Sequence, residues 1–256
     1  MQHLFSPEGE AALAAVLRLQ PLMAFDFDGT LAPIVARPTE ARIPQAIVKH
    51  LRALAQRLPV AIVSGRAVGD VRQRLGFEPH FVLGSHGAED DSDPPGTAAR
   101  AAALDGLRLA LHSHANALAA AGVLVEDKGA SVALHFRLAR DPDQAQALIA
   151  EVLTPARQGL QIFGGKKVVN VMAAGAPDKA AAVRALVARC AARAAFFAGD
   201  DVNDEPVFKS APSHWLTLRI GRDDPASMAR FGLVGPQDMP LLLQRVLSLL
   251  EAQVDR

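Results

Sequence analysis

The stretch Phe25-Asp26-Phe27-Asp28-Gly29-Thr30-Leu31 decides the fold, because it continues an apolar run that begins at Leu22. A short run that is apolar throughout is typical of a strand buried on both faces of a parallel sheet. Open parallel sheets bind their ligands at the carboxyl ends of the strands. The pair Asp26 and Asp28 therefore stands where such a protein has its functional site.

These two carboxylates suit phosphate chemistry. They stand two residues apart and repel each other, so their burial is costly unless a cation joins them, and Mg²⁺ favours few carboxylates with water and phosphate oxygens. One aspartate can attack phosphorus to give an aspartyl-phosphate, while the other protonates the leaving oxygen and later activates water. Gly29 and Thr30 let the chain turn with backbone N–H groups aimed at the phosphate.

Strands and helices alternate along both ends of the chain. We expect strands at 22–27, 60–63 and 81–83, with helices at 45–58 and 67–75 between them. After residue 175 we expect helices at 178–192, 205–210 and 237–252 and strands at 194–198 and 215–220. This alternation favours parallel strand pairing and predicts an α/β fold.

The middle of the chain has a different pattern. The breaker cluster Asp90–Gly96 marks an exit from the first domain. A helix at 98–121, a hairpin of 123–126 with 131–137, a helix at 142–156 and a hairpin of 160–163 with 167–172 around a Gly164-Gly165 turn are expected next. The order αββαββ predicts a small α+β domain over 98–175, inserted into a core domain made of 1–97 and 176–256.

Three further signals fall at strand-to-helix junctions of the alternating pattern. They are Ser64 in Ser64-Gly65-Arg66, Lys179 near a helix start, and the acidic cluster Asp200, Asp201 and Asp204 after strand 194–198. A hydroxyl and N–H groups at a helix start bind anions, a lysine offsets transition-state charge, and clustered acids bind metal. Each signal alone is ordinary for a helix cap or a solvated charge, but together they predict a phosphate and metal site.

In this order the four motifs resemble those of the haloacid-dehalogenase-like phosphohydrolases. The resemblance implies a Rossmann-like parallel-sheet core with a cap domain inserted between the second and third motifs. It implies that Asp26 is the nucleophile and a metal ligand, and that Asp28 is the general acid/base and a ligand through its backbone carbonyl. It also implies that Ser64 and Lys179 bind phosphate, that Asp200 is the third metal ligand, and that Gly29, Thr30, Asp201 and Asp204 support the site.

A narrower resemblance, from about Leu22 to Phe208, is to the trehalose-6-phosphate phosphatases. It rests on Ser64-Gly65-Arg66, Gly84-Ser85-His86-Gly87-Ala88-Glu89, Glu126-Asp127-Lys128-Gly129, Val132-Ala133-Leu134-His135-Phe136-Arg137 and the motif from Gly199 to Glu205. It implies Mg²⁺-dependent hydrolysis of trehalose 6-phosphate through an aspartyl-phosphate, the last step of trehalose biosynthesis. The substrate-binding residues that it implies are Arg66, His86, Glu89, Glu126, Lys128, Arg137, Lys166 and Asn170.

The chain departs from the family pattern at Asn170, where the family has a Glu four residues after Lys166. Asparagine can bond a hydroxyl but lacks a charged acceptor, a loss of about 1–2 kcal/mol in a dry site. Two alternatives therefore stay open: a phosphatase of another glycosyl phosphate, such as sucrose phosphate or glycosyl-3-phosphoglycerate, and a non-catalytic sugar-phosphate-binding module. His86 and His135 each fit a ligand role or a structural role.

Composition excludes other classes of function. Lys and Arg number 27, as do Asp and Glu, and aromatic residues are scarce, so we expect no nucleic-acid binding. No apolar run approaches the roughly 20 residues of a membrane span, and the start lacks a signal-peptide pattern. Cys190 has no partner for an internal disulfide, which suits a reducing compartment. We expect a cytoplasmic monomer that acts on a small sugar phosphate.

Overall fold

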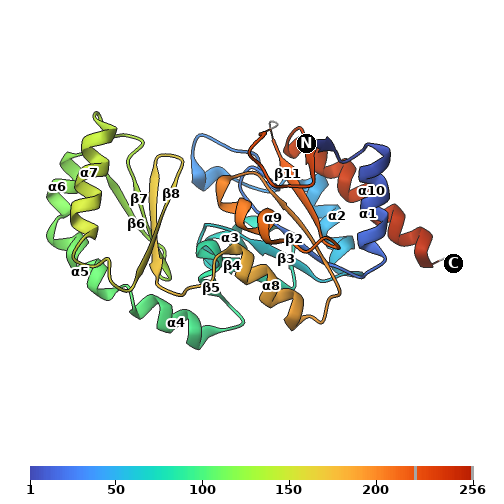
Figure 1. Ribbon diagram of the computed structural model, residues 1–256, viewed down its shortest axis with the longest axis horizontal. Coiled ribbons are helices and arrows are strands. Elements are labelled where there is room, and N and C mark those ends of the chain that lie inside the picture. Colours follow the sequence, from blue (N-terminus) through green and yellow to red (C-terminus); the bar gives the residue numbers. More distant parts are fainter. Residues whose placement is uncertain (222–223, 255–256) are drawn as a thin grey trace. The chain divides into compact units, whose positions relative to one another are not determined.

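The computed structural model describes residues 1–221 and 224–254, whose helices and strands are drawn in Figure 1. The chain divides into two compact units. Unit 1 consists of Met1–Gly87 and Asp178–Arg256, and unit 2 of Ala88–Pro177. Within the described ranges, no helix combines the length and the apolar character needed to cross a membrane.

Unit 1 is built on a parallel sheet. Its strands are β1 (Gln2–His3), β2 (Leu22–Phe25), β3 (Val60–Val63), β4 (Phe81–Gly84), β10 (Ala195–Gly199), β11 (Leu216–Ile220) and β12 (Phe231–Leu233). Its helices are α1 (Pro7–Leu17), α2 (Gln45–Ala55), α3 (Val68–Leu75), α8 (Lys179–Arg189), α9 (Glu205–Ser210) and α10 (Met239–Val254), with 3-10 turns η1 (Pro38–Glu40), η2 (Ser85–Gly87), η3 (Val202–Asp204) and η4 (Pro236–Asp238). These strands neighbour one another in the order β1-β12-β11-β10-β2-β3-β4, and every pair is parallel.

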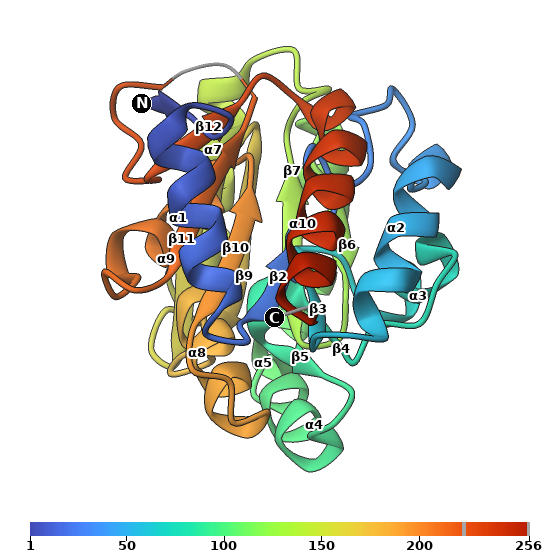
Figure 2. The ribbon, with the colours of Figure 1, turned by 90° about the vertical axis from the view of Figure 1, so that its right-hand side faces the viewer.

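Helices cover the centre of this sheet. Every residue of β2, β3 and β10 is buried, as expected for parallel strands packed on both faces. Figure 2 shows α1 and α10 together in front of the sheet, and α2 packs against α10, whereas α8 packs against α9. The sequence prediction of an α/β fold is confirmed.

The register of the central strands positions the site. Phe25 of β2 pairs with Ala198 of β10 on one side and with Ile62 of β3 on the other. The three strands are therefore level at their carboxyl ends. As a result, the residues that follow them, among them Asp26 and Ser64, emerge at one edge of the sheet.

Unit 2 has its own antiparallel sheet and its own core. Its elements are β5 (Glu89–Asp90), α4 (Pro94–Ala102), α5 (Asp105–Ser113), α6 (Ala115–Ala120), β6 (Leu124–Asp127), β7 (Ser131–His135), α7 (Pro142–Leu153), β8 (Leu160–Gly165) and β9 (Val168–Ala173). The strand order is β6-β7-β9-β8, with every neighbour antiparallel. Val132, Leu134 and Val171 are fully buried on one face, against apolar residues of α5, α6 and α7.

The helix predicted at 98–121 is wrong, since three shorter helices occupy this segment. Side chains compete for backbone carbonyls at both breaks. Arg108 donates to the carbonyl of Ala101 at 2.7 Å, and Ser113 donates to the carbonyl of Ala110 at 2.8 Å. The predicted breaker cluster instead opens α4, because Asp93 caps that helix and its prolines occupy the first turn.

The turn predicted at Gly164-Gly165 is also wrong. Both glycines belong to β8, and the hairpin turns at Lys166-Lys167, with Lys167 at φ 62°. The backbone carbonyl of Lys167 accepts from the N–H of Phe136 at 3.0 Å, which fixes the turn against the end of β7. Moving the turn outward lengthens the ladder between β8 and β9, and pairing of the whole sheet outweighs the local glycine preference.

We predict that Phe197→Ala destabilises the protein by about 3–5 kcal/mol, because this ring lies fully buried in β10 and leaves a cavity between β10 and α9. Leu241→Ala, at an exposed position of α10, is the control and should change stability by less than about 0.5 kcal/mol. Denaturant unfolding of both variants measures this. Equal losses of stability in the two variants would show that Phe197 of β10 contributes no more to the core than an exposed residue does.

Candidate active site

Lys179 is buried at the start of α8 and holds two carboxylates. Its Nζ donates to Oδ1 of Asp26 at 2.6 Å and to Oδ1 of Asp204 at 2.7 Å. The helix begins here because Asp178 caps it, accepting from the N–H of Ala181 at 2.8 Å. The third sequence motif thus supplies a buried ammonium group to residues of the first and fourth motifs.

Asp204 is fully buried and uses both carboxylate oxygens within unit 1. Oδ1 binds Lys179, and Oδ2 accepts from the N–H groups of Asp200 at 2.9 Å and of Asp201 at 3.0 Å. This close approach requires glycine at position 199, where a Cβ would lie 2.3 Å from Cγ of Asp204. Asp204 therefore fixes the loop after β10 and orients Asp200.

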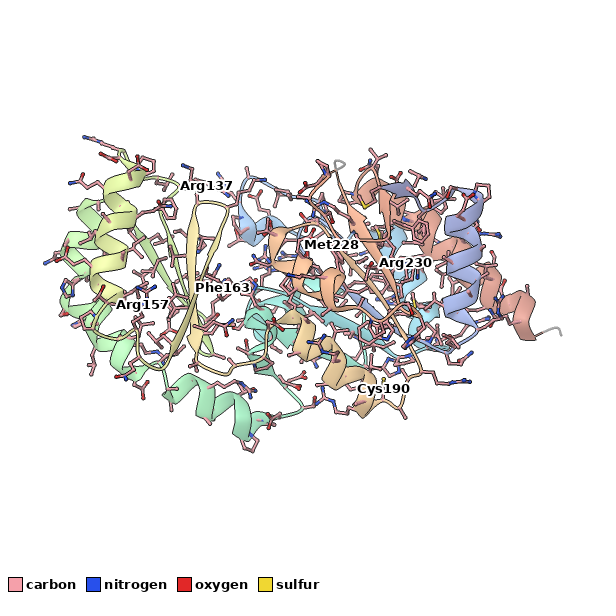
Figure 3. All side chains as sticks on the ribbon, viewed as in Figure 1. Arg137, Arg157, Phe163, Cys190, Met228 and Arg230 are labelled. Atoms are coloured by element: carbon pink, nitrogen blue, oxygen red, sulfur yellow. The ribbon has the colours of Figure 1, made fainter. Side chains whose placement is uncertain are left out.

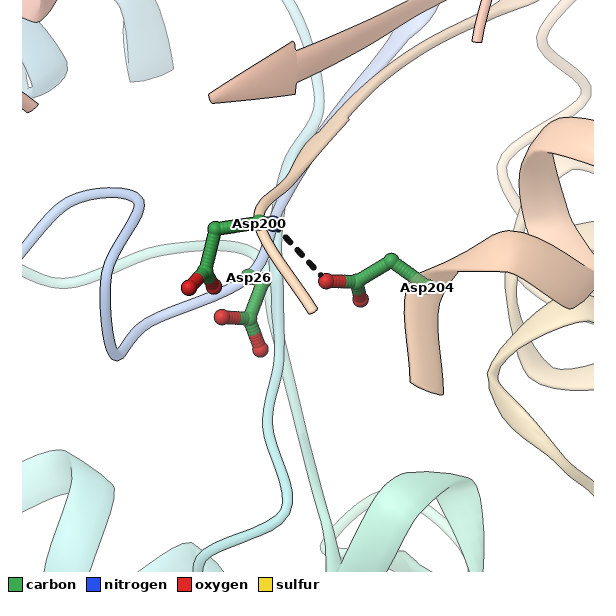
Figure 4. Close-up of side chains that lie close together, drawn as sticks. All are labelled: Asp26, Asp200 and Asp204. Carbon is green, nitrogen blue, oxygen red and sulfur yellow. Dashed lines mark hydrogen bonds between the residues drawn. The ribbon is translucent and has the colours of Figure 1, made fainter. Parts of the chain in front are cut away.

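Asp26 and Asp200 follow neighbouring strands, and their carboxyl groups lie side by side in Figure 4. One oxygen from each of Asp26, Asp200 and Asp204 falls within a group spanning 4.8 Å. Gly29 makes room for this group. Its φ is 78°, and a Cβ there would lie 2.1 Å from Oδ2 of Asp200.

The carboxyl groups are short of positive charge. Burial raises the pKa of Asp26 well above its ordinary value, and the charges of Asp204 and Asp200 add to the effect of burial, although Lys179 opposes it. Burial and Asp204 likewise raise the pKa of Asp200 to about 7. Burial alone would lower the pKa of Lys179, but Asp204 and Asp26 outweigh it and raise that pKa. One ammonium group does not neutralise three carboxylates.

The donor set suits a divalent cation. Oδ1 of Asp200 is buried, and nothing in the described part of the chain hydrogen-bonds it. Buried polar atoms are rarely left without a partner, so this oxygen is available to a ligand. Oxygen ligands from few carboxylates are typical of hard divalent cations. The hydroxyl of Thr30, also buried, has no partner among residues 1–221 and 224–254 either.

Asp28 is held by Arg66. The guanidinium group donates from Nε to Oδ2 at 2.6 Å and from Nη2 to Oδ1 at 2.7 Å. Arg66 also donates to Asp70 at 2.7 Å and to the carbonyl of Pro38 at 3.0 Å, and it lies 5.4 Å from the ring centroid of Phe27. Arg66, which was predicted to contact the substrate, thus binds Asp28, the predicted acid/base.

Ser64 is buried beside a loop in an unusual backbone conformation. Ser85 and His86 follow β4 with φ 50° and 59°, and such left-handed conformations cost about 1–2 kcal/mol per residue. The N–H of Ser85 donates to the carbonyl of Arg66 at 2.7 Å, and that of His86 to the carbonyl of Ser64 at 2.9 Å. Strained backbone conformations concentrate at functional sites. Here the conformation of Ser85 and His86 places His86 beside the second motif.

One face of the unit 2 sheet carries the predicted residues Glu126 and Asn170 together with His135. Ala133 pairs with Glu126 on one side and with Asn170 on the other, and paired residues point to the same face. His135 lies two residues from Ala133, hence on that face too. Its Nε2 is 2.8 Å from Oε2 of Glu126. This face is opposite to the one that packs on the helices.

The Glu126 carboxylate is part of a small charged cluster. Lys128 lies 3.6 Å from its Oε2, and the bond with His135, together with Lys128, lowers the pKa of Glu126 despite partial burial. Asn170, by contrast, is only 4% exposed. The cluster therefore presents an ionised acceptor held by two basic neighbours, which suits hydrogen bonds to hydroxyl groups.

The remaining predicted residues lie elsewhere in unit 2. Arg137 is exposed beyond the end of β7, and Figure 3 labels it together with Phe163 of β8. Lys166 is exposed in the β8–β9 turn, and Glu89 is half-buried in β5. Arg137, Lys166 and Glu89 all belong to unit 2.

Sequence reasoning missed Asp70 and Arg74. Arg74 is buried and donates from Nε to Oδ2 of Asp70 at 2.9 Å, and its Nη2 bonds Oδ1. The signal that could have revealed them is spacing, since Arg66, Asp70 and Arg74 recur every four residues, one helical turn apart.

A haloacid dehalogenase-like hydrolase from Bacteroides thetaiotaomicron superposes with a TM-score of 0.64 at 13% identity, over 88% of this chain and 99% of the other, so the likeness concerns the fold. Residues 24–222 match the model of the trehalose-phosphatase family. The chain belongs to that family, and the sequence resemblance is confirmed.

Curated relatives are found in mycobacteria. A trehalose-phosphate phosphatase of Mycobacterium marinum is 34% identical over 232 residues, which cover 85% of this chain and 59% of the relative. An uncharacterised glycosyl hydrolase of Mycobacterium tuberculosis is 38% identical over 201 residues, 74% of this chain and 15% of the relative. The chain thus spans less than two thirds of the length of these relatives.

Among solved structures, a trehalose-6-phosphate phosphatase related protein superposes with a TM-score of 0.75 at 22% identity. The match covers 91% of this chain and 99% of the other. At this level of identity the likeness concerns the fold.

We predict that, without metal, Asp200 makes stability fall as pH rises. The native state keeps this proton up to about pH 7, whereas the unfolded state releases it near its ordinary pKa of 3.8, so the stabilisation is full below pH 4 and is lost by about pH 7. Thermal melting in chelator should show wild type losing stability relative to Asp200→Asn across this range. Added Mg²⁺ should restore the wild type more than the variant. If the difference in stability between wild type and Asp200→Asn does not change with pH, the raised pKa of Asp200 is contradicted.

Proposed function

We propose that this protein is a Mg²⁺-dependent phosphatase that hydrolyses trehalose 6-phosphate to trehalose and phosphate. The observation that carries the proposal is the buried contact of Lys179 with Asp26 and Asp204, beside Asp200 with its unbonded oxygen. Such a site combines an anionic nucleophile, a fixed positive charge and a place for a cation. Membership of the trehalose-phosphatase family supports the choice of substrate.

In the first step Asp26 acts as the nucleophile. A carboxylate oxygen of Asp26 attacks phosphorus, and the bond between phosphorus and the sugar oxygen breaks with its electron pair on that oxygen. Asp28 donates a proton to the leaving oxygen, which releases the sugar. Lys179 holds the other oxygen of Asp26 in place, and Ser64 with Lys179 binds the phosphoryl oxygens.

In the second step the aspartyl-phosphate is hydrolysed. Asp28, now ionised, takes a proton from water as the water oxygen attacks phosphorus. The bond from phosphorus to the Asp26 oxygen breaks, which restores the carboxylate and releases inorganic phosphate. Asp28 then carries the proton needed for the next cycle.

Asp26, Asp200 and the backbone carbonyl of Asp28 would hold the cation. When bound, Mg²⁺ supplies positive charge that offsets the phosphoryl oxygens and the clustered carboxylates. Asp204, whose oxygens are occupied by Lys179 and two N–H groups, supports the ligands without joining them. The unbonded Oδ1 of Asp200 supports this arrangement.

We further propose that unit 1 is the catalytic core and unit 2 the cap that selects the sugar. Glu126, Lys128, Arg137 and Lys166 would bond sugar hydroxyl groups, because charged groups form strong hydrogen bonds with a polyhydroxyl ligand. The protein would act as a cytoplasmic monomer. Its single cysteine suits a reducing compartment.

A phosphatase of another glycosyl phosphate is the second candidate, and Asn170 favours it. This residue is buried in the middle of β9, on the face that carries Glu126, and it lacks the charge of the family's Glu. A panel of trehalose 6-phosphate, sucrose 6-phosphate, glucose 6-phosphate and a glycosyl-3-phosphoglycerate separates the two. Preference for a substrate other than trehalose 6-phosphate would retain the chemistry and change the substrate.

We predict that Asp26→Asn abolishes phosphate release from every member of the panel, because the amide cannot form the aspartyl-phosphate. The variant keeps the volume of the side chain, so its fold should persist by circular dichroism. Phosphate release with Mg²⁺ and with chelator measures the effect. Turnover close to wild type in this variant would contradict the nucleophile assignment, and no turnover by wild type would favour the non-catalytic binding module.

We predict that Glu126→Gln raises KM for the preferred sugar phosphate by roughly ten- to a hundredfold and changes kcat little. The carboxylate is ionised and held by His135 and Lys128, so its loss removes a charged hydrogen bond worth about 1.5–3 kcal/mol. Glu151→Gln, an exposed position on α7, is the matched control. A fall in kcat with KM unchanged would place Glu126 in the chemistry instead.

A further inference from the structure

Asp28 depends on one side chain for its orientation. Across residues 1–221 and 224–254, Arg66 is the only side chain with a hydrogen bond to its carboxylate. The Asp28 side chain is 42% exposed, so packing does not fix it, in contrast to the buried Asp26. The fork of two parallel bonds sets both the distance and the plane of the carboxyl group.

Arg66 is in turn fixed from the opposite side. Its Nη1 donates to Oδ2 of Asp70 at 2.7 Å, and the same oxygen accepts from Nε of Arg74 at 2.9 Å. Two guanidinium groups thus share one carboxylate, and they lower the pKa of Asp70, with Arg74 as the larger cause. Asp70 is therefore ionised at neutral pH and binds both arginines.

Arg74, the last residue in this series of contacts, is buried. The Arg74 side chain is 8% exposed, and its Nη1 donates to the carbonyl of Thr39 at 2.5 Å. Arg66 donates to the neighbouring carbonyl, that of Pro38, at 3.0 Å. Both arginines therefore also hold the η1 turn, which lies in the segment that follows the first motif.

We infer that Arg66, Asp70 and Arg74 form a positioning network that orients Asp28 for proton transfer to the leaving oxygen. The inference rests on the proposed function, because Asp28 has this task only in a phosphatase. It changes the expected role of Arg66 from substrate contact to positioning. Asp70 and Arg74 would act on catalysis without touching the substrate.

The network can be tested by the chemistry of the leaving group. A sugar alkoxide needs a proton as it leaves, whereas 4-nitrophenolate leaves without one. The value of kcat/KM reports steps up to formation of the aspartyl-phosphate, so it isolates proton donation by Asp28 from its later role with water. Damage to the fold or to Asp26 lowers kcat/KM for both substrates alike.

We expect Arg66→Met to lower kcat/KM for the best sugar phosphate of the panel by about a hundredfold, within the usual range of acid catalysis, and for 4-nitrophenyl phosphate by less than about threefold. Arg66→Lys should recover part of the loss, because it keeps the charge but not the fork. Asp70→Asn should show the same selective pattern more weakly. Arg72→Met, on the same helix with an ion pair to Glu78, should change neither value.

Each contrary result has its own meaning. Equal losses on both substrates, or no loss in Arg66→Met, contradict the inference and leave the proposed function intact. Loss in Arg66→Met without a selective effect in Asp70→Asn removes Asp70 and Arg74 from the network. Wild-type turnover of the aryl phosphate alone contradicts the sugar-phosphate function and the inference with it, because no leaving group then needs the proton.

Discussion

The buried contact of Lys179 with Asp26 and Asp204 is the constraint on which unit 1 depends. It joins the start of α8 to the loops after β2 and β10, so residues more than 150 positions apart meet at one point. Burying one ammonium group with two carboxylates and a third nearby is costly. A divalent cation bound among these carboxylates would offset that cost, so the arrangement favours ligand binding over the stability of the free protein.

Two aspartates two residues apart are held in opposite ways. Asp26 is buried, with a raised pKa, and is fixed by one lysine. Asp28 is half exposed and is fixed by the fork of Arg66. In the proposed mechanism, the nucleophile Asp26 needs a fixed position shielded from water, whereas the acid/base Asp28 must reach the leaving oxygen and then water. The difference in their surroundings matches these two tasks.

In the proposed function, unit 2 would recognise the sugar through its own sheet, separate from the sheet of unit 1. One face of that sheet is apolar and packs on helices, while the other carries Glu126, His135 and Asn170. Alternation along antiparallel strands allows this division, because successive side chains point to opposite faces. In the proposed function, a substitution on the polar face, as at Asn170, would change sugar specificity without disturbing the core of unit 2.

The sequence by itself determined the fold class, the order of the four motifs and the two hairpins of the insert, because hydrophobic periodicity and strand-end chemistry are local properties. It could not decide the breaks that divide residues 94–120 into three helices, where the side chain of Arg108 bonds the carbonyl of Ala101. Nor could it place the Lys166-Lys167 turn, which is bonded by Phe136, a residue distant in sequence. Only the tertiary structure joined Arg66 to Asp28 and left an oxygen of Asp200 unbonded. Such partners are chosen by packing in three dimensions, which periodicity along one chain does not encode.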